Sequence, residues 1–361
     1  MNFVTEYKVM ETNGKYYSFI GMNTGEGFAG NYDKVITERG FERLYIIKGA
    51  AGTGKSTLMR KFAESAEKMG SSVRYYLCGS DPESLDCITI NGDIAVLDGT
   101  SPHSFEMRYG GAVSEFIDTT RFWNSEMLCS FRSDIIKLND IKGAMFGYAY
   151  SFLKAFSVLS SQRKSYIERA VYKSKIESYV SRLLQTFGKP KGTGATDDLV
   201  LRSVGMKGLT RLDTLEKAAK SIFVVNDMYS SAFVLMNCLS QKLSLAGFDT
   251  VISRDPVSPD NICEIFIPQV SLLITVENIC KADKTINMSR FVNRDALAQA
   301  RASLRRSYNC GKLLLAEAVG LFEQGGKAHF ALESIYSSAM DFEALNVLAD
   351  SVNLEMANIW S

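Results

Sequence analysis

The chain has 361 residues, of which 46% are hydrophobic, and its 41 basic and 40 acidic side chains give a net charge of +1. This length and apolar content suffice for two domains, each with its own core. The near-zero charge gives no global electrostatic argument for nucleic acid or an anionic membrane as the main partner. Its seven cysteines never form a C-x-x-C pair, so they indicate neither a zinc site nor a disulfide framework.

The N-terminal residues lack the basic and then apolar pattern of a signal peptide. No apolar run reaches about 18 residues, the length needed to cross a bilayer. We therefore expect a cytoplasmic protein with no membrane partner.

The first elements are expected to alternate between strands and helices. Residues 16–21 predict a short strand, residues 23–27 a loop, and residues 32–39 a helix. The apolar run 44–47 predicts the next strand, and a helical pattern extends from Lys55 to about Met69.

Between that strand and that helix, residues 49–56 read Gly-Ala-Ala-Gly-Thr-Gly-Lys-Ser, which matches the P-loop, or Walker A, motif in its proper context. Glycines let backbone N–H groups wrap around a phosphate chain, and the helix N-terminus adds partial positive charge. Lys55 can reach the β- and γ-phosphates, and Ser56 can ligate Mg²⁺. The residues expected to contact the nucleotide are Gly49, Ala51, Gly52, Thr53, Gly54, Lys55, Ser56 and Thr57.

A second metal ligand is expected at Asp98. Asn91-Gly92 predicts a hairpin turn between apolar runs at 88–90 and 94–97, and the second run delivers Asp98 at its end. A Walker B aspartate occupies this kind of position, so Asp98 is a candidate for the Mg²⁺ site. Gly99 follows where some hydrolytic P-loop enzymes carry a glutamate, so hydrolysis is expected to be slow.

Two further carboxylates follow the predicted strand at 73–78. Asp81 or Asp86 could accept a proton from an acceptor hydroxyl, as in a small kinase. The alternative is that Asp81 begins an Asp-Pro turn and that Asp86 caps a segment.

Four other polar residues are weaker candidates. His103 could touch phosphate, whereas His329 is expected to serve packing. Arg163 or Arg254 could supply an arginine finger, although neither has positional support.

Long amphipathic patterns occupy residues 112–187 and predict a helical appendage. Glycine, proline and threonine then interrupt the pattern, so residues 188–198 are expected to be a linker. We therefore expect a P-loop domain at 1–187 and a second domain at 199–361.

The second domain is expected to be a decayed copy of the first. An offset of 178 residues sets Gly49 on Asp227 and brings the apolar runs at 222–225, 250–252 and 272–275 onto strands of the first domain. Phe233 then occupies the position of Lys55, and no glycine remains in the loop, so this copy should not hold phosphate. The alternative is that any two α/β segments share a similar rhythm.

The chain resembles a family of tandem P-loop proteins from Firmicutes, catalogued as uncharacterised ATPases or ATP-binding proteins of the P-loop nucleoside triphosphate hydrolase superfamily. The resemblance rests on residues 24–28, 78–86, 98–103, 266–272 and 328–336. It implies ATP binding but no known substrate. Some family members keep both P-loops intact, so the loss at Phe233 is a departure.

The expected fold class is therefore α/β, a P-loop NTPase fold duplicated in tandem, with helical extensions and a degenerate second copy. The leading functional hypothesis is a Mg²⁺-ATP-binding protein that is a slow or partner-stimulated ATPase. One alternative is a small-molecule or nucleotide kinase. Another is a nucleotide-gated interaction module, which binds a protein partner through its second domain and helices.

Overall fold

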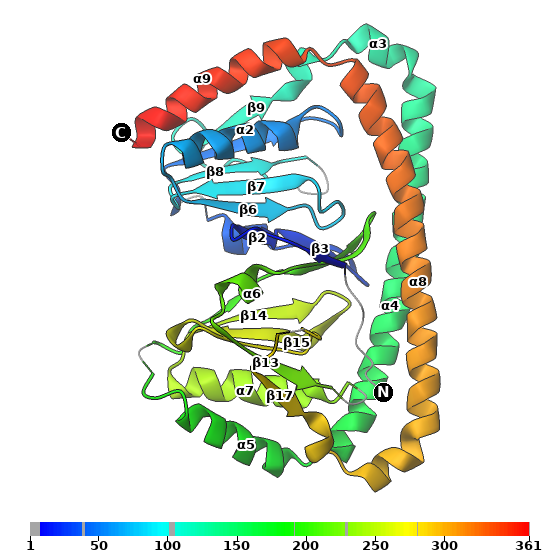
Figure 1. Ribbon diagram of the computed structural model, residues 1–361. Coiled ribbons are helices and arrows are strands. Elements are labelled where there is room, and N and C mark those ends of the chain that lie inside the picture. Colours follow the sequence, from blue (N-terminus) through cyan, green and yellow to red (C-terminus); the bar gives the residue numbers. More distant parts are fainter. Residues whose placement is uncertain are drawn as a thin grey trace.

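The computed structural model describes residues 8–37, 40–100, 105–190, 192–227, 230–279 and 281–360. It is a mixed α/β structure in which two six-stranded sheets lie one beyond the other along a pair of long helices (Figure 1). No helix in these ranges is long and apolar enough to cross a membrane.

The first sheet has the strand order β2-β6-β7-β8-β5-β9. In it, β7 runs antiparallel to both neighbours and the other adjacent strands pair in parallel. Asn91 and Gly92 both have positive φ angles, 53° and 87°, at the β7–β8 turn, so the predicted hairpin is confirmed. The strands are β2 (Tyr16–Phe19), β5 (Arg43–Lys48), β6 (Val73–Leu77), β7 (Leu85–Ile90), β8 (Ile94–Asp98) and β9 (Ser114–Asp118).

The second sheet, β10-β14-β15-β16-β13-β17, repeats this order and these strand directions. Arg43 pairs with Ile94 in the first sheet and Ser221 pairs with Leu272 in the second, which is the same register displaced by 178 residues. Strands are present at the three places that this offset predicted. They are β10 (Thr196–Asp198), β13 (Ser221–Asn226), β14 (Thr250–Asp255), β15 (Ser258–Ile267), β16 (Leu272–Thr275) and β17 (Lys284–Asn287).

In each half, one helix connects two strands that hold equivalent places in the two sheets. α2 (Lys55–Lys68) buries Leu58, Met59 and Phe62 in the core of the first sheet. α7 (Ala232–Ala246) buries Leu235, Met236 and Leu239 in the core of the second sheet. This apolar burial holds the helix that follows each loop firmly against its sheet.

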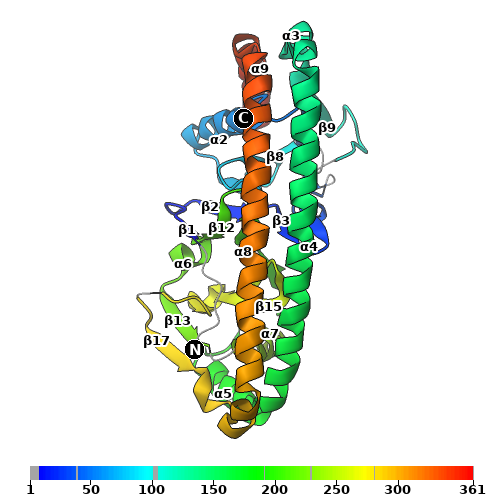
Figure 2. The same ribbon diagram turned by 90° about the vertical axis from the view of Figure 1, so that its right-hand side faces the viewer.

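Two long helices, α4 (Arg132–Ala170) and α8 (Arg294–Ser338), run side by side in opposite directions past both sheets (Figures 1 and 2). After α4, α5 (Lys173–Gln185) packs on α7 of the second half. After α8, α9 (Phe342–Trp360) packs on α2 of the first half. The terminal helix of each half therefore packs on a helix of the other half. α3 (Ser125–Ser130) precedes α4.

A small sheet lies between the two halves and consists of β1 (Lys8–Met10), β12 (Gly208–Leu212) and β11 (Arg202–Gly205). α6 (Thr214–Ala218) follows it. Because β1 pairs with β12, as Lys8 does with Thr210, the segment before the first sheet is tied to the second half.

Four local expectations differ from the structure. The helix expected at 32–39 is the single turn α1 (Tyr32–Val35), and residues 38–39 lie outside the described ranges. The loop expected at 23–27 is the turn of a hairpin, β3 (Gly21–Thr24) and β4 (Gly27–Gly30). The linker expected at 188–198 includes β10, because β10 gains backbone hydrogen bonds from the distant strand β14, which a local sequence pattern does not predict. The helical appendage expected at 112–187 includes the strand β9.

Candidate functional site

The glycine-rich loop joins the carboxyl end of β5 to α2. Gly52 and Gly54 have φ angles of 75° and 84°, a left-handed conformation that favours glycine. Gly54 is the N-cap of α2 and no side chain caps this helix. The first N–H groups of α2 are therefore available to an anion.

Packing also requires glycine in this loop. A Cβ atom on Gly49 would lie 2.0 Å from Thr119 Oγ1, and one on Gly52 would lie 2.3 Å from the Glu333 carbonyl oxygen. Buried Thr53 holds the loop from within, since its hydroxyl donates to the Ala50 carbonyl at 2.9 Å. The loop is thus held between Thr119, which directly follows β9, and α8. Gly52 is required for both reasons, its positive φ and its close contact.

Three of the predicted site residues come together at the end of β5 and β8. Ile47 pairs with Asp98 across these strands, which brings the aspartate to the loop. Lys55 Nζ donates to the Ala50 carbonyl at 2.6 Å and lies 3.6 Å from Asp98 Oδ2. Ser56 lines a cavity beside this loop, and its Oγ accepts a hydrogen bond from Leu85 N at 3.0 Å.

The cavity at this loop, called the first cavity, has a volume of about 910 Å³. It is lined by Lys55, Ser56 and Asp98, and also by Lys142 of α4 with His329 and Glu333 of α8. Its size is within the range typical of small-molecule sites. The site therefore combines side chains from both halves of the chain.

The two other predicted carboxylates also line the first cavity, in different environments. Asp81 accepts hydrogen bonds from Glu83 N at 3.3 Å and Ser84 Oγ at 2.9 Å, the local pattern of an Asp-Pro turn. Burial, followed by the charge of Asp98, raises the pKa of Asp86 to about 8. Asp86 is therefore the carboxylate whose protonation changes near neutral pH.

The raised pKa of Asp86 predicts a pH dependence of stability. Between about pH 4 and pH 8 the folded state binds a proton that the unfolded state releases, so Asp86 destabilises the fold as the pH rises. Asp86→Asn should therefore raise the melting temperature by a few degrees at pH 9 and by less at pH 5. Thermal unfolding followed by circular dichroism at both pH values checks this, and an equal shift at both would contradict it.

Magnesium fits this set of donors. Across the described residues, no three or more His, Cys, Asp or Glu side chains form a group that could hold a metal ion. Mg²⁺ bound with a nucleotide usually takes only one or two protein ligands, with phosphates and water completing its coordination. Ser56 and Asp98 would suffice for such a site.

The long helices contribute two side chains to the first cavity that the sequence did not reveal. Lys142 of α4 lines it, and burial, and next the charge of Lys55, lower the pKa of Lys142. His329 was expected to serve packing, yet it lines the cavity with Nε2 3.5 Å from Glu333 Oε1. Helical periodicity alone could not predict that the Lys142 and His329 side chains line this cavity.

The two arginine-finger candidates lie elsewhere. Arg163 lines a different cavity, and Arg254 pairs with Asp198 at 2.8 Å beside the second sheet. His103 lies outside the described residues. Lys142 is therefore the cation that the opposing helix offers to the loop.

In the second half, an aspartate side chain binds the start of α7, the helix that corresponds to α2. Buried Asp227 accepts hydrogen bonds from Ala232 N at 2.8 Å and Ser231 Oγ at 3.3 Å, at the start of α7. Phe233 stands where Lys55 stands in the first half, as the offset predicted. This aspartate occupies an N–H group at the start of α7 that a bound phosphate would need.

Comparisons with family models, curated proteins and solved structures found no match to this chain. The resemblance to tandem P-loop proteins therefore stays a prediction.

Proposed function

We propose that the first cavity binds Mg²⁺-ATP and that the protein is a slow or partner-stimulated ATPase. The observation that carries this proposal is the convergence of Lys55, Ser56 and Asp98 at the end of β5 and β8, beside an uncapped helix N-terminus. We also propose that the chain is a tandem duplication of a P-loop fold. The common strand order and the shared offset of 178 residues support it.

In this proposal, each part of the loop has a separate role. The backbone of residues 49–57 donates to phosphate oxygens, and Lys55 stabilises negative charge on the β- and γ-phosphates. Ser56 and Asp98 would hold Mg²⁺, which neutralises phosphate charge when bound. Lys142 approaches from α4 and adds a second cation opposite the loop.

Slow turnover is expected because Gly99 follows Asp98, so a carboxylate that could activate water is missing from that position. Asp86 lines the first cavity, but with a pKa of about 8 it is mostly protonated at neutral pH. A partner or acceptor that lowers this pKa would speed the reaction.

The role of Lys142 can be tested by turnover. Lys142→Met should lower the rate of ATP loss by about tenfold or more, because a cation that stabilises transition-state charge is removed. Lys137→Met is the matched control, since Lys137 is exposed on the same helix. Phosphate release measured under saturating Mg²⁺-ATP distinguishes them, and equal rates for both variants would remove Lys142 from the proposal.

A kinase is the second candidate function, favoured by the raised pKa of Asp86 beside the P-loop. Incubating the protein with ATP and a panel of nucleotides and small alcohols separates the possibilities. Loss of ATP that depends on one acceptor supports a kinase with Asp86 as base. Tight ATP binding with no loss supports a nucleotide-gated module, whose protein partner would bind the second half and the long helices.

A further inference from the structure

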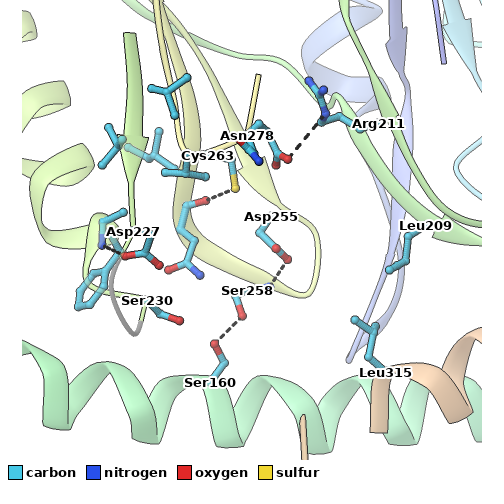
Figure 3. Close-up of a pocket in the computed structure, with 18 of the residues that line it drawn as sticks. Ser160, Leu209, Arg211, Asp227, Ser230, Asp255, Ser258, Cys263, Asn278 and Leu315 are labelled. Atoms are coloured by element: carbon cyan, nitrogen blue, oxygen red, sulfur yellow. Dashed lines mark hydrogen bonds and ion pairs between the residues drawn. The ribbon is translucent and has the colours of Figure 1, made fainter. Parts of the chain in front are cut away.

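A second cavity, of about 1140 Å³, lies between the second sheet and the α4–α8 pair (Figure 3). It is formed at the ends of β13 and β14, by residues that include Asp227 and Asp255. Figure 3 shows Ser258 on the sheet side facing Ser160 on the helix below it, with 2.9 Å between their hydroxyl oxygens. The cavity thus occupies the same place in the second half as the first cavity does in the first half, beyond the ends of parallel strands, where α/β sheets commonly bind ligands.

The acidic groups on the sheet side of the second cavity already have partners. Asp227 caps α7, and Asp255 Oδ1 accepts hydrogen bonds from Val257 N at 2.8 Å and Ser258 N at 3.1 Å. Glu277 pairs with Arg202 at 2.9 Å. Each of these carboxylates is therefore already engaged, Asp227 and Asp255 by hydrogen-bond donors of the chain and Glu277 by Arg202.

The helical side differs, because its cations lack acidic partners. Arg163 of α4 is only 5% exposed, and its Nη1 donates to the Ser307 carbonyl at 3.1 Å. Its Nε has no hydrogen-bond partner in the described part of the chain, and neither Arg163 nor Lys312 of α8 forms an ion pair there. Burial lowers the pKa of Arg163, which reflects the cost of keeping this charge inside.

A buried cation without a carboxylate is costly, and such a group in a native structure calls for an explanation. Asn261 Oδ1, on the sheet side, is also buried without a partner among the residues described. Aromatic rings of Phe156, Phe233 and Tyr308 line the same cavity. Cation, amide and aromatic surface together match a ligand that has an anionic group and a ring system.

We propose that the second cavity binds a small organic phosphate of the size of a nucleoside monophosphate, with its phosphate on Arg163 and Lys312. Its ring system lies against the aromatic side chains of the cavity. The loop at Asp227 takes no part in holding the phosphate, which distinguishes this site from the first cavity. The inference does not depend on ATP binding at Lys55.

Calorimetric titration of the Lys55→Ala variant tests the site, because that variant removes the main phosphate contact of the first cavity. The probes are AMP, GMP, inorganic phosphate and citrate. We expect AMP or GMP to bind with a Kd below about 1 mM and inorganic phosphate to compete. If neither nucleotide binds, or if only citrate binds, the proposal is overturned. It is also overturned if AMP or GMP binds the wild type but not Lys55→Ala.

Arg163→Met in the same background should weaken AMP or GMP binding by about tenfold or more, whereas Arg305→Met, on the exposed face of α8, should leave it unchanged. Because Arg163 has no acidic partner, Arg163→Met should keep or raise the melting temperature without ligand. A lower melting temperature with unchanged nucleotide affinity would make Arg163 a structural residue and contradict the site.

Discussion

Replacing Lys55 with alanine should weaken Mg²⁺-ATP binding by about 100-fold or more, equivalent to roughly 2.7 kcal/mol. The Lys55 side chain is only 10% exposed, so its charge acts on a phosphate in a medium that screens it less than bulk water does. Fixed backbone N–H groups and Mg²⁺ would remain, which is why some affinity should survive. Titration with a fluorescent ATP analogue, with and without Mg²⁺, measures the change.

Lys68→Ala is the matched control for that experiment. Lys68 is an exposed residue in the last turn of the same helix and does not line the first cavity. Its removal should leave the affinity within about twofold, since one distant exposed charge is screened by salt. If Lys55→Ala bound Mg²⁺-ATP as tightly as Lys68→Ala does, the proposed nucleotide site would be wrong.

The features that local chemistry dictates were open to prediction from the sequence. Asn91-Gly92 favours two positive φ angles, and this preference predicts the hairpin between β7 and β8. β8 then ends at Asp98. The equal spacing of apolar runs in the two halves likewise located β13, β14 and β16. These signals lie within a few residues of the element that they define.

The helical wall of the first cavity was not open to prediction. Lys142 and His329 reach the loop only because α4 and α8 run antiparallel past it, and that pairing joins segments far apart in the chain. Each long helix is polar on several faces, so periodicity did not single out the side turned to the loop. Sequence patterns are local, so they did not reveal the positions of these two side chains.

The exchange of terminal helices was hidden for a related reason. α5 and α9 follow the first and second halves in the chain, yet α5 packs on α7 of the second half and α9 on α2 of the first. An amphipathic pattern shows that a helix has an apolar face but does not identify the surface that covers it. Chain order therefore suggested domain boundaries that the packing of α5 and α9 crosses.

The largest effect on stability is expected from Glu264→Ala, at a buried ionic network beside the second sheet. Arg202 Nη1 lies 3.1 Å from Glu264 Oε2, and Arg211 Nη1 lies 3.4 Å from Glu264 Oε1. All three side chains are at most 6% exposed. Since Glu264 belongs to β15 and both arginines to β11 and β12, this network ties the small central sheet to the second sheet.

Glu264→Ala should lower the free energy of unfolding by about 3–5 kcal/mol, because Arg202 and Arg211 then lose the buried carboxylate that they share. Urea unfolding followed by circular dichroism measures the loss. Glu168→Ala breaks the exposed pair with Lys173, 2.7 Å long, and should cost less than about 1 kcal/mol. The double variant Arg202→Met/Glu264→Leu should recover part of the loss, because a buried pair replaced by apolar side chains leaves fewer uncompensated charges. A loss no larger than that of Glu168→Ala would mean that water or a rearranged partner compensates the arginines, and the network would then not hold the two sheets together.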